Sequence, residues 1–164
     1  MNARQIALGG VTAALAVVIM CLGGLVPLAT YILPMLLCIL LQLLLPRLTL
    51  KGAWVWYSAV SLLSVLLAPD KEAAAVWVFL GYYPIIKPCL DCKKMGIVIK
   101  FLIFNASTLI MYALLIHLFG MAELANEFSS LGLLLGGITL ALGNLCFFLL
   151  DVVLSRFATK FIRR

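Results

Sequence analysis

Long apolar segments separated by short polar connections dominate the chain. None of these segments shows the strict alternation of polar and apolar residues that a half-exposed strand requires. Backbone polar groups in lipid must be hydrogen-bonded internally, so leucine-rich segments of this length predict membrane helices. The sequence therefore predicts an all-α integral membrane protein, a bundle of six transmembrane helices in a single domain, 1–164. The predicted helices cover about 4–25, 30–45, 52–68, 69–87, 96–119 and 129–155.

The fourth segment differs from the others because charged residues stand at its beginning. Asp70, Lys71 and Glu72 are consecutive, and the purely apolar part that follows runs only from Ala73 to Ile86. At 1.5 Å per residue this part is about 21 Å long, whereas the hydrocarbon core of a bilayer is about 30 Å thick. Either the charged ends sink partway into the membrane, or the bilayer is thinned there, or the segment is re-entrant.

Two interpretations of the charged run remain open. Pro69 followed by acidic residues is ordinary chemistry for the start of a helix, because the helix dipole favours negative charge there. Alternatively, Asp70 and Glu72 bind a cationic or hydroxyl-rich group in an outward pocket, and Lys71 binds an anionic one, since charges close to the hydrocarbon tend to be functional. Polar residues at the same end of the later segments would complete this pocket. The candidate substrate-binding residues are Asp70, Lys71, Glu72, His117, Glu123 and Asn126.

A second group of polar residues stands at the other end of the fourth segment. Tyr82 and Tyr83 are predicted to be interfacial anchors, and Lys87 is predicted to extend its ammonium group toward the headgroups. Asp70 and Tyr82 are twelve residues apart, which is roughly 18 Å along a helix. They contact one small ligand only if the segment is bent or re-entrant, so a continuous helix predicts two separate polar regions.

The last two segments carry polar residues at seven-residue spacing, which places them on one helix face. Asn105 and Tyr112 form one such pair, and Asn144 and Asp151 form the other. Asp151 is predicted to pair with Arg156 at the membrane interface. The alternative is that Asp151 belongs to a proton or ion relay.

Composition and charge agree with a membrane protein and indicate its orientation. The chain is 66% hydrophobic and 11% charged, with a mean hydropathy of +1.24, whereas soluble domains carry about 25% charged residues. The net charge of +6 does not indicate nucleic-acid binding, because the basic residues are scattered at helix ends. With both termini in the cytoplasm, eleven of the twelve basic residues lie inside and only Lys71 lies outside, as the positive-inside rule requires. The expected location is the bacterial cytoplasmic membrane.

Motifs for cofactor or metal chemistry are weak. Cys89 and Cys92 form a single C-x-x-C spacing without a second pair, so free thiols are expected. The sequence has no glycine-rich phosphate loop, nucleophile elbow or H-E-x-x-H pattern. We therefore expect no cofactor, no metal and no enzymatic activity. A membrane enzyme that uses His117 with Glu123 or Asp70 is the least favoured class.

The beginning of the chain carries a resemblance to a known family. Arg4, Ile6 and Ala7 form an Arg-x-Ile-Ala opening, followed by small residues at four-residue spacing, in a small basic chain with six hydrophobic segments. This pattern resembles the membrane-embedded substrate-binding S components of energy-coupling factor (ECF) transporters. The resemblance implies a substrate pocket that opens outward and a small-residue face on the first helix that docks on a coupling subunit. The docking residues that it implies are Ala3, Ala7, Gly10 and Ala14.

The expected function follows from this resemblance and from the polar outer turn. The chain would capture a small molecule from the outer side, within membrane lipid, and would work with a coupling membrane subunit and separate ATPase subunits. The alternative is a small membrane binding or assembly protein that contacts lipid or a partner complex through its charged outer turn.

Overall fold

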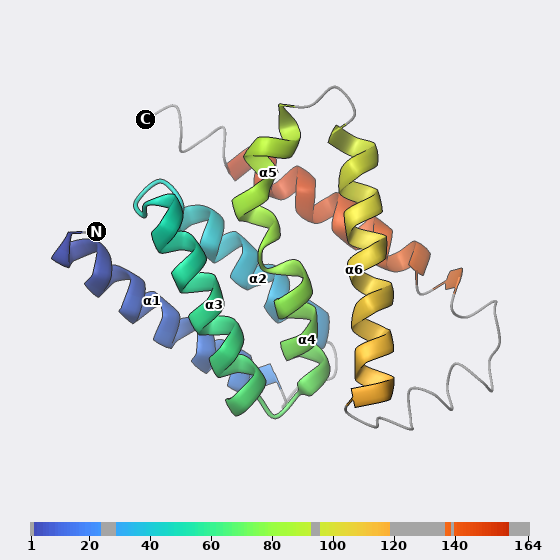
Figure 1. The fold of residues 1–164 in the computed structure, drawn as a ribbon, viewed down its shortest axis with the longest axis horizontal. Helices are drawn as coiled ribbons and strands as arrows, with labels where there is room; N and C mark the ends of the chain where they lie inside the picture. Colours follow the sequence, from blue (N-terminus) through green and yellow to red (C-terminus); the bar gives the residue numbers. More distant parts are fainter. Residues whose placement is uncertain (1, 24–28, 93–95, 119–136, 139, 158–164) are drawn as a thin grey trace.

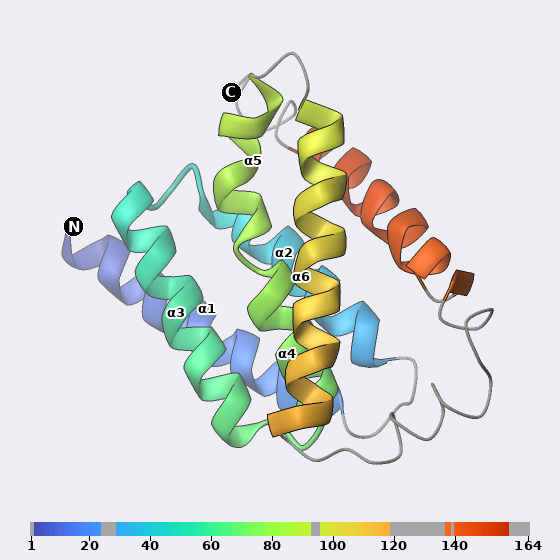
Figure 2. The same cartoon turned by 45° about the vertical axis from the view of Figure 1, so that its right-hand side comes forward.

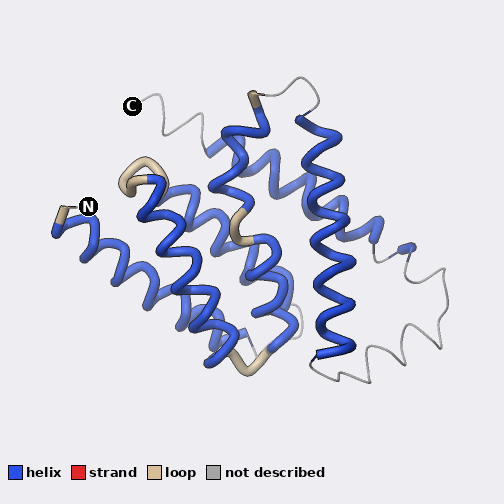
Figure 3. The backbone as a smooth tube through the Cα atoms, in the orientation of Figure 1, coloured by secondary structure: helices blue, strands red, loops and turns tan. Residues whose placement is uncertain are grey.

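The computed structural model of the protein describes residues 2–23, 29–92, 96–118, 137–138 and 140–157. Within these ranges every regular element is a helix and no strand occurs (Figure 3). The all-α prediction is therefore confirmed for this part of the chain. The helices are α1 (Ala3–Leu22), α2 (Ala29–Leu44), α3 (Leu50–Leu67), α4 (Lys71–Leu80), α5 (Tyr83–Asp91), α6 (Gly96–Leu118) and a last helix over Leu140–Phe157, the C-terminal helix.

Each of the six predicted segments contains helix, and five of the helical segments have a length that suits a membrane. Among the described residues, five helical segments are long and apolar enough to cross a bilayer, and Thr30–Leu44 is a shorter apolar helix. Large apolar side chains cover the outside of the bundle; Val11, for example, is 72% exposed and Ile97 is 69% exposed. Such a surface suits lipid rather than water. These observations are consistent with a multi-pass membrane protein. The five long segments are Ala3–Leu22, Leu50–Leu67, Lys71–Asp91, Gly96–Leu114 and Leu140–Phe157.

The helices run up and down between two ends of the bundle (Figures 1 and 2). We call one end the Asp70 end; it holds the α3–α4 connection and the last turn of α6, at the bottom of Figure 1. The other is the Asp91 end, where α5 stops and α6 begins. Helix α1 lies at the edge and packs mainly on α3, whereas α4 packs on α2, α6 and α3. The C-terminal helix crosses obliquely behind α6 in Figure 1.

The fourth segment is the interior one because its side chains face the core on several sides. Ala73, Ala74 and Trp77 are almost completely buried. The small alanines let α4 lie close to its neighbours. The Trp77 ring lies 6.1 Å from the ring of Trp56 and 5.9 Å from that of Tyr57, centroid to centroid. This aromatic contact holds α4 against α3.

This segment is also broken, at Gly81 and Tyr82, into α4 and α5. The sequence explains the break, because Pro84 has no backbone N–H to bond the Leu80 carbonyl and its ring crowds that carbonyl. The Leu80 oxygen instead accepts from the Cys38 thiol of α2, at 3.8 Å from Sγ. The tyrosine hydroxyl of Tyr57 on α3 donates to the Val78 carbonyl. Of the continuous and the bent segment considered above, the structure shows the interrupted one, and side chains of α2 and α3 bond the carbonyls beside the interruption.

Several predicted helix boundaries shift by a few residues. The fourth segment was expected to start at Pro69, but the helix starts at Lys71 and Asp70 is its N-cap. The first helix ends at Leu22 rather than near residue 25. The predicted start of the sixth segment, near residue 129, lies outside the described residues.

Candidate functional site

Among the described residues, clusters of hydrogen-bonded and charged side chains lie at both ends of the bundle. The first group, which we call the Asp70 cluster, joins α2, α4 and α6. The second, the Asp151 cluster, joins α5, α6 and the C-terminal helix. The Asp70 cluster comprises Thr30, Tyr31, Asp70, Glu72 and Tyr112, and the Asp151 cluster comprises Tyr83, Lys87, Asp91, Lys100 and Asp151.

Asp70 caps α4 and also reaches α2. Its Oδ1 accepts hydrogen bonds from the backbone N–H groups of Glu72 at 3.0 Å and Ala73 at 3.1 Å. Its Oδ2 accepts from the Thr30 hydroxyl at 2.7 Å. The first two bonds satisfy N–H groups that the first turn of a helix leaves free. The helix-start interpretation of the charged run is therefore confirmed for Asp70.

Glu72 begins a short chain of hydrogen bonds between helices. Its Oε1 accepts from the Tyr31 hydroxyl at 2.7 Å, and the Tyr31 and Tyr112 hydroxyls lie 3.1 Å apart. Tyr31 is 44% exposed, so the chain is reachable from outside the protein. A carboxylate and two phenolic hydroxyls offer acceptors and donors to a cationic or hydroxyl-rich group.

Lys71 serves a different element. Its ammonium group donates to the carbonyls of Val65 at 2.9 Å and Ala68 at 3.0 Å, at the end of α3. A cation at this position compensates the negative end of the helix dipole and bonds carbonyls that the last turn leaves free. In this arrangement Lys71 supports the α3–α4 connection.

The other predicted substrate residues are placed only in part. His117 lies in α6 near the Asp70 end, but the described residues do not include its side chain. Glu123 and Asn126 lie outside the described residues. The structure thus brings Asp70, Lys71 and Glu72 together at the start of α4, and it adds Thr30, Tyr31 and Tyr112, which the sequence did not assign to this site.

The residues implied by the family resemblance share the outer side of α1. Ala3, Ala7, Gly10 and Ala14 are all exposed. A Cβ atom built on Gly10 would meet no atom within 4 Å. The opposite side of α1 packs on α3, where Trp56 Nε1 donates to the Thr12 hydroxyl at 3.1 Å. In the part of the chain that the structure describes, the small residues therefore form an exposed row at the edge of the bundle.

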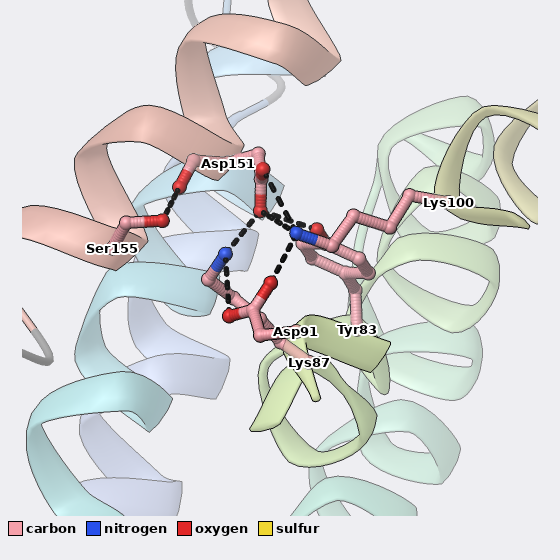
Figure 4. Close-up of polar contacts among 6 residues, drawn as sticks. All are labelled: Tyr83, Lys87, Asp91, Lys100, Asp151 and Ser155. Atoms are coloured by element: carbon pink, nitrogen blue, oxygen red, sulfur yellow. Dashed lines mark hydrogen bonds and ion pairs between the residues drawn. The ribbon is translucent and has the colours of Figure 1, made fainter. Parts of the chain in front are cut away.

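The charged part of the Asp151 cluster consists of two lysines and two aspartates in mutual contact (Figure 4). Lys87 Nζ lies 3.3 Å from Asp91 Oδ2 and also contacts Asp151 Oδ1. Lys100 Nζ lies 3.1 Å from Asp151 Oδ2 and also contacts Asp91 Oδ1. The Tyr83 hydroxyl donates to Asp151 Oδ1. Each lysine thus bridges both aspartates, and the four charges sum to zero.

Burial within this cluster is uneven. The side chains of Lys87 and Lys100 are 3% and 8% exposed, whereas those of Asp91 and Asp151 are 45% and 21% exposed. The prediction that Lys87 extends to the headgroups is therefore wrong: it is folded inward, because two carboxylates hold its ammonium. Lys87 and Lys100 both form ion pairs with the Asp151 carboxylate, and the pairing of Asp151 with Arg156 stays a prediction.

An aromatic layer covers the cluster on the side toward the middle of the bundle. Tyr83, Phe104 and Phe147 each stand four residues along their helix from a charged residue of the cluster. The Phe147 ring lies 4.8 Å from that of Tyr83 and stacks on that of Phe104 at 4.5 Å. Tyr83 is only 3% exposed, so the expectation of an interfacial anchor is wrong for this residue. Tyr82 bonds the Ser107 hydroxyl at 2.9 Å, also between helices.

Beyond the aromatic layer two asparagines join α6 to the C-terminal helix. Asn105 Nδ2 donates to Asn144 Oδ1, and Asn144 Nδ2 donates to Asn105 Oδ1, both at 3.0 Å. Each amide also donates to the carbonyl four residues earlier in its own helix. Asn105 and Tyr112 share a helix face as predicted, but they bond different partners.

Two observations concern possible metal ligands and thiols. Among the described residues, no group of three or more histidine, cysteine, aspartate or glutamate side chains is arranged to hold a metal ion. Cys89 and Cys92 are exposed free cysteines, as expected. Comparison of the chain with protein-family models, with curated proteins and with solved structures finds no match.

Proposed function

We propose that the chain is the membrane-embedded, substrate-binding subunit of an ECF-type transporter. The observation that carries the proposal is the exposed row of Ala3, Ala7, Gly10 and Ala14 on the edge helix α1. Small residues at this spacing allow the backbones of two helices to approach closely in lipid. Because α1 uses its opposite side to pack on α3, a partner helix can occupy the row without displacing the bundle. We propose that this partner helix belongs to a coupling membrane subunit, which is linked to ATPase subunits.

In this proposal both termini lie in the cytoplasm of a bacterial cell and the Asp70 end faces outside. The substrate is a small molecule with a cationic or hydroxyl-rich group. Glu72 and the hydroxyls of Tyr31 and Tyr112 supply matching acceptors and donors, and Tyr31 is accessible. Asp70 holds the start of α4 in place through its cap. The binding subunit itself performs no chemistry on the substrate.

The docking part of the proposal is tested by affinity purification of the tagged protein from native membranes. Recovery of an ATPase pair with a second membrane subunit is expected. Ala14→Leu should abolish this recovery, since it adds three carbon atoms at one end of the row. Leu15→Phe is the matched control, because Leu15 is 51% exposed but lies outside the row. Reproducible absence of any ATPase contradicts the proposal, and recovery of some other membrane complex instead favours the assembly-protein alternative.

The substrate site is tested by native mass spectrometry of small molecules that copurify with the protein. Glu72→Gln keeps the shape of the side chain and removes its charge, so binding of the copurifying molecule should weaken. Asp70→Asn is the companion variant. It removes the charge and keeps the cap, because asparagine caps a helix as well as aspartate does. If Glu72→Gln leaves the affinity unchanged, the Asp70 cluster is a structural contact and does not bind the substrate.

A further inference from the structure

The attachment of α5 differs from that of the rest of the bundle. Helix α5 has nine residues and follows the break at Gly81 and Tyr82. It packs on α2 and α6 less extensively than α4 does. Two of its side chains, Lys87 and Asp91, enter the Asp151 cluster and connect α5 to α6 and to the C-terminal helix. These charge contacts hold α5 to those two helices together with the ring contact between Tyr83 and Phe147.

The break has the features of a hinge. The carbonyls of Val78 and Leu80, near the end of α4, already accept from Tyr57 and Cys38 rather than from the next turn of helix. Pro84 has no N–H, so no backbone hydrogen bond joins it to the Leu80 carbonyl. Rotation of α5 about Gly81 and Tyr82 therefore breaks no backbone hydrogen bond at this position. Sharp kinks at proline are the common sites at which a helix bends.

The energetics of the cluster suit a contact that opens. The attraction between buried charges is largely offset by the cost of removing them from water, so a neutral cluster adds little stability over an apolar one. Loss of one lysine, in contrast, leaves two carboxylates with a single ammonium, and so one uncompensated negative charge at a partly buried contact. Asp91 and Asp151 are partly exposed, so water can hydrate the charges from the Asp91 end as the helices separate.

We propose that the Asp151 cluster is a latch that holds α5 closed against α6 and the C-terminal helix. When the latch opens, α5 turns about the break at Gly81 and Tyr82 while α4 stays packed against Trp56 and Tyr57. The aromatic layer of Tyr83, Phe104 and Phe147 separates as part of the same motion, because Tyr83 moves with α5. This proposal does not depend on the transporter assignment.

The test measures the distance between α5 and the C-terminal helix by pulsed electron spin resonance, on the full chain in lipid nanodiscs. One spin label is attached to the native Cys89, which is exposed on α5, and the other to Leu149→Cys, at a position 55% exposed. The remaining cysteines are replaced by serine. The control pair joins α3 and α6 through Ser58→Cys and Leu109→Cys, with Cys89 replaced by serine; both positions are exposed. The perturbation is Lys100→Met, which removes one charge of the cluster from an element that does not move.

Lys100→Met should raise the ratio of long to short α5 distances at least about tenfold, with the control distances unchanged. An unchanged α5 distance, or broadening of both pairs together as in general unfolding, overturns the latch. If Lys100→Met does not fold, the variant with all four charges replaced, Lys87→Met, Asp91→Leu, Lys100→Met and Asp151→Leu, is compared with the parent protein. The apolar variant should then lack a long-distance population that the parent protein shows, and identical distributions overturn the proposal.

Discussion

Asn105 and Asn144 donate to each other across α6 and the C-terminal helix, so replacing either one removes two hydrogen bonds at once. Both side-chain amides also donate to a carbonyl of their own helix, at 2.8 Å and 2.9 Å. These additional bonds fix the orientation of the two amides. A single alanine substitution therefore leaves the carbonyl oxygen of the remaining asparagine without its partner.

The expected magnitude follows from this geometry. Hydrogen bonds between helices in membrane proteins contribute about 0.6 kcal/mol on average and at most about 1.7 kcal/mol each. Two reciprocal bonds in a fixed orientation should give a coupling free energy of about 1 to 2 kcal/mol. Such a coupling changes the unfolding equilibrium constant roughly 5- to 30-fold.

A double-mutant cycle measures this coupling. The free energy of unfolding in mixed micelles is compared for the parent protein, Asn105→Ala, Asn144→Ala and the double variant. The loss of packing from each truncation cancels in the cycle, which leaves the interaction between the two side chains. Thr108→Ala is the control partner for Asn144→Ala, because the Thr108 hydroxyl bonds the Phe104 carbonyl of its own helix. That control cycle should couple by less than about 0.5 kcal/mol. Additive single substitutions at Asn105 and Asn144 would show that the pair does not join the helices.

Further substitutions probe three other contacts of the fold. Gly81→Ala should destabilise the protein by about 1 to 3 kcal/mol in the same unfolding assay. The reason is that the added Cβ would lie 2.8 Å from Trp77 Cε3. An unchanged stability would mean that the backbone at the break moves to accommodate the Cβ at no cost. Asp70→Ala should cost about 1 kcal/mol through the lost cap, whereas Asp70→Asn should be nearly neutral; equal losses, measured by thermal melting, would contradict the capping role. Trp56→Phe should lower the free energy of unfolding by about 1 kcal/mol through the lost hydrogen bond to the Thr12 hydroxyl. The same substitution should lower it less in a Thr12→Val background, and an equal loss in both backgrounds would contradict the role of this bond.

The apolar segments could be located from the sequence because hydrophobic length is a local property. A helix in lipid bonds its own backbone groups, so a leucine-rich segment predicts its conformation without reference to its neighbours. The short apolar length from Ala73 to Ile86 also signalled an unusual fourth segment. The position of the break, however, was not predicted, although Pro84 is its local cause.

The candidate sites were predictable only in part. The sequence placed Asp70 in the first turn of a helix that starts at Pro69, and the structure shows that Asp70 stands just before the helix as its N-cap. The contacts of Asp70 with Thr30 and of Glu72 with Tyr31 join residues about forty positions apart. No local pattern contains such a pairing, so the composition of the Asp70 cluster required the packing of α2 against α4.

The Asp151 cluster shows the same division most clearly. Lys87 and Asp91 stand four residues apart, a spacing at which oppositely charged side chains on a helix meet, and this pair was visible in the sequence. Charged residues inside apolar segments usually face the interior of the bundle and pair with one another. This rule could have identified Lys100 and Asp151 as interior charges. The sequence did not show that Lys100 and Asp151 lie in one cluster with Lys87.

The sequence by itself therefore determined which segments are helical and that several charges would need partners in an apolar environment. Only the tertiary structure decided which charges pair, that Lys87 turns inward rather than outward, and how the broken fourth segment is held. The physical reason is that helix formation in lipid is set by interactions within a few residues. Charge neutralisation instead depends on which helices lie side by side. Helices α5 and α6 and the C-terminal helix meet only in the folded bundle.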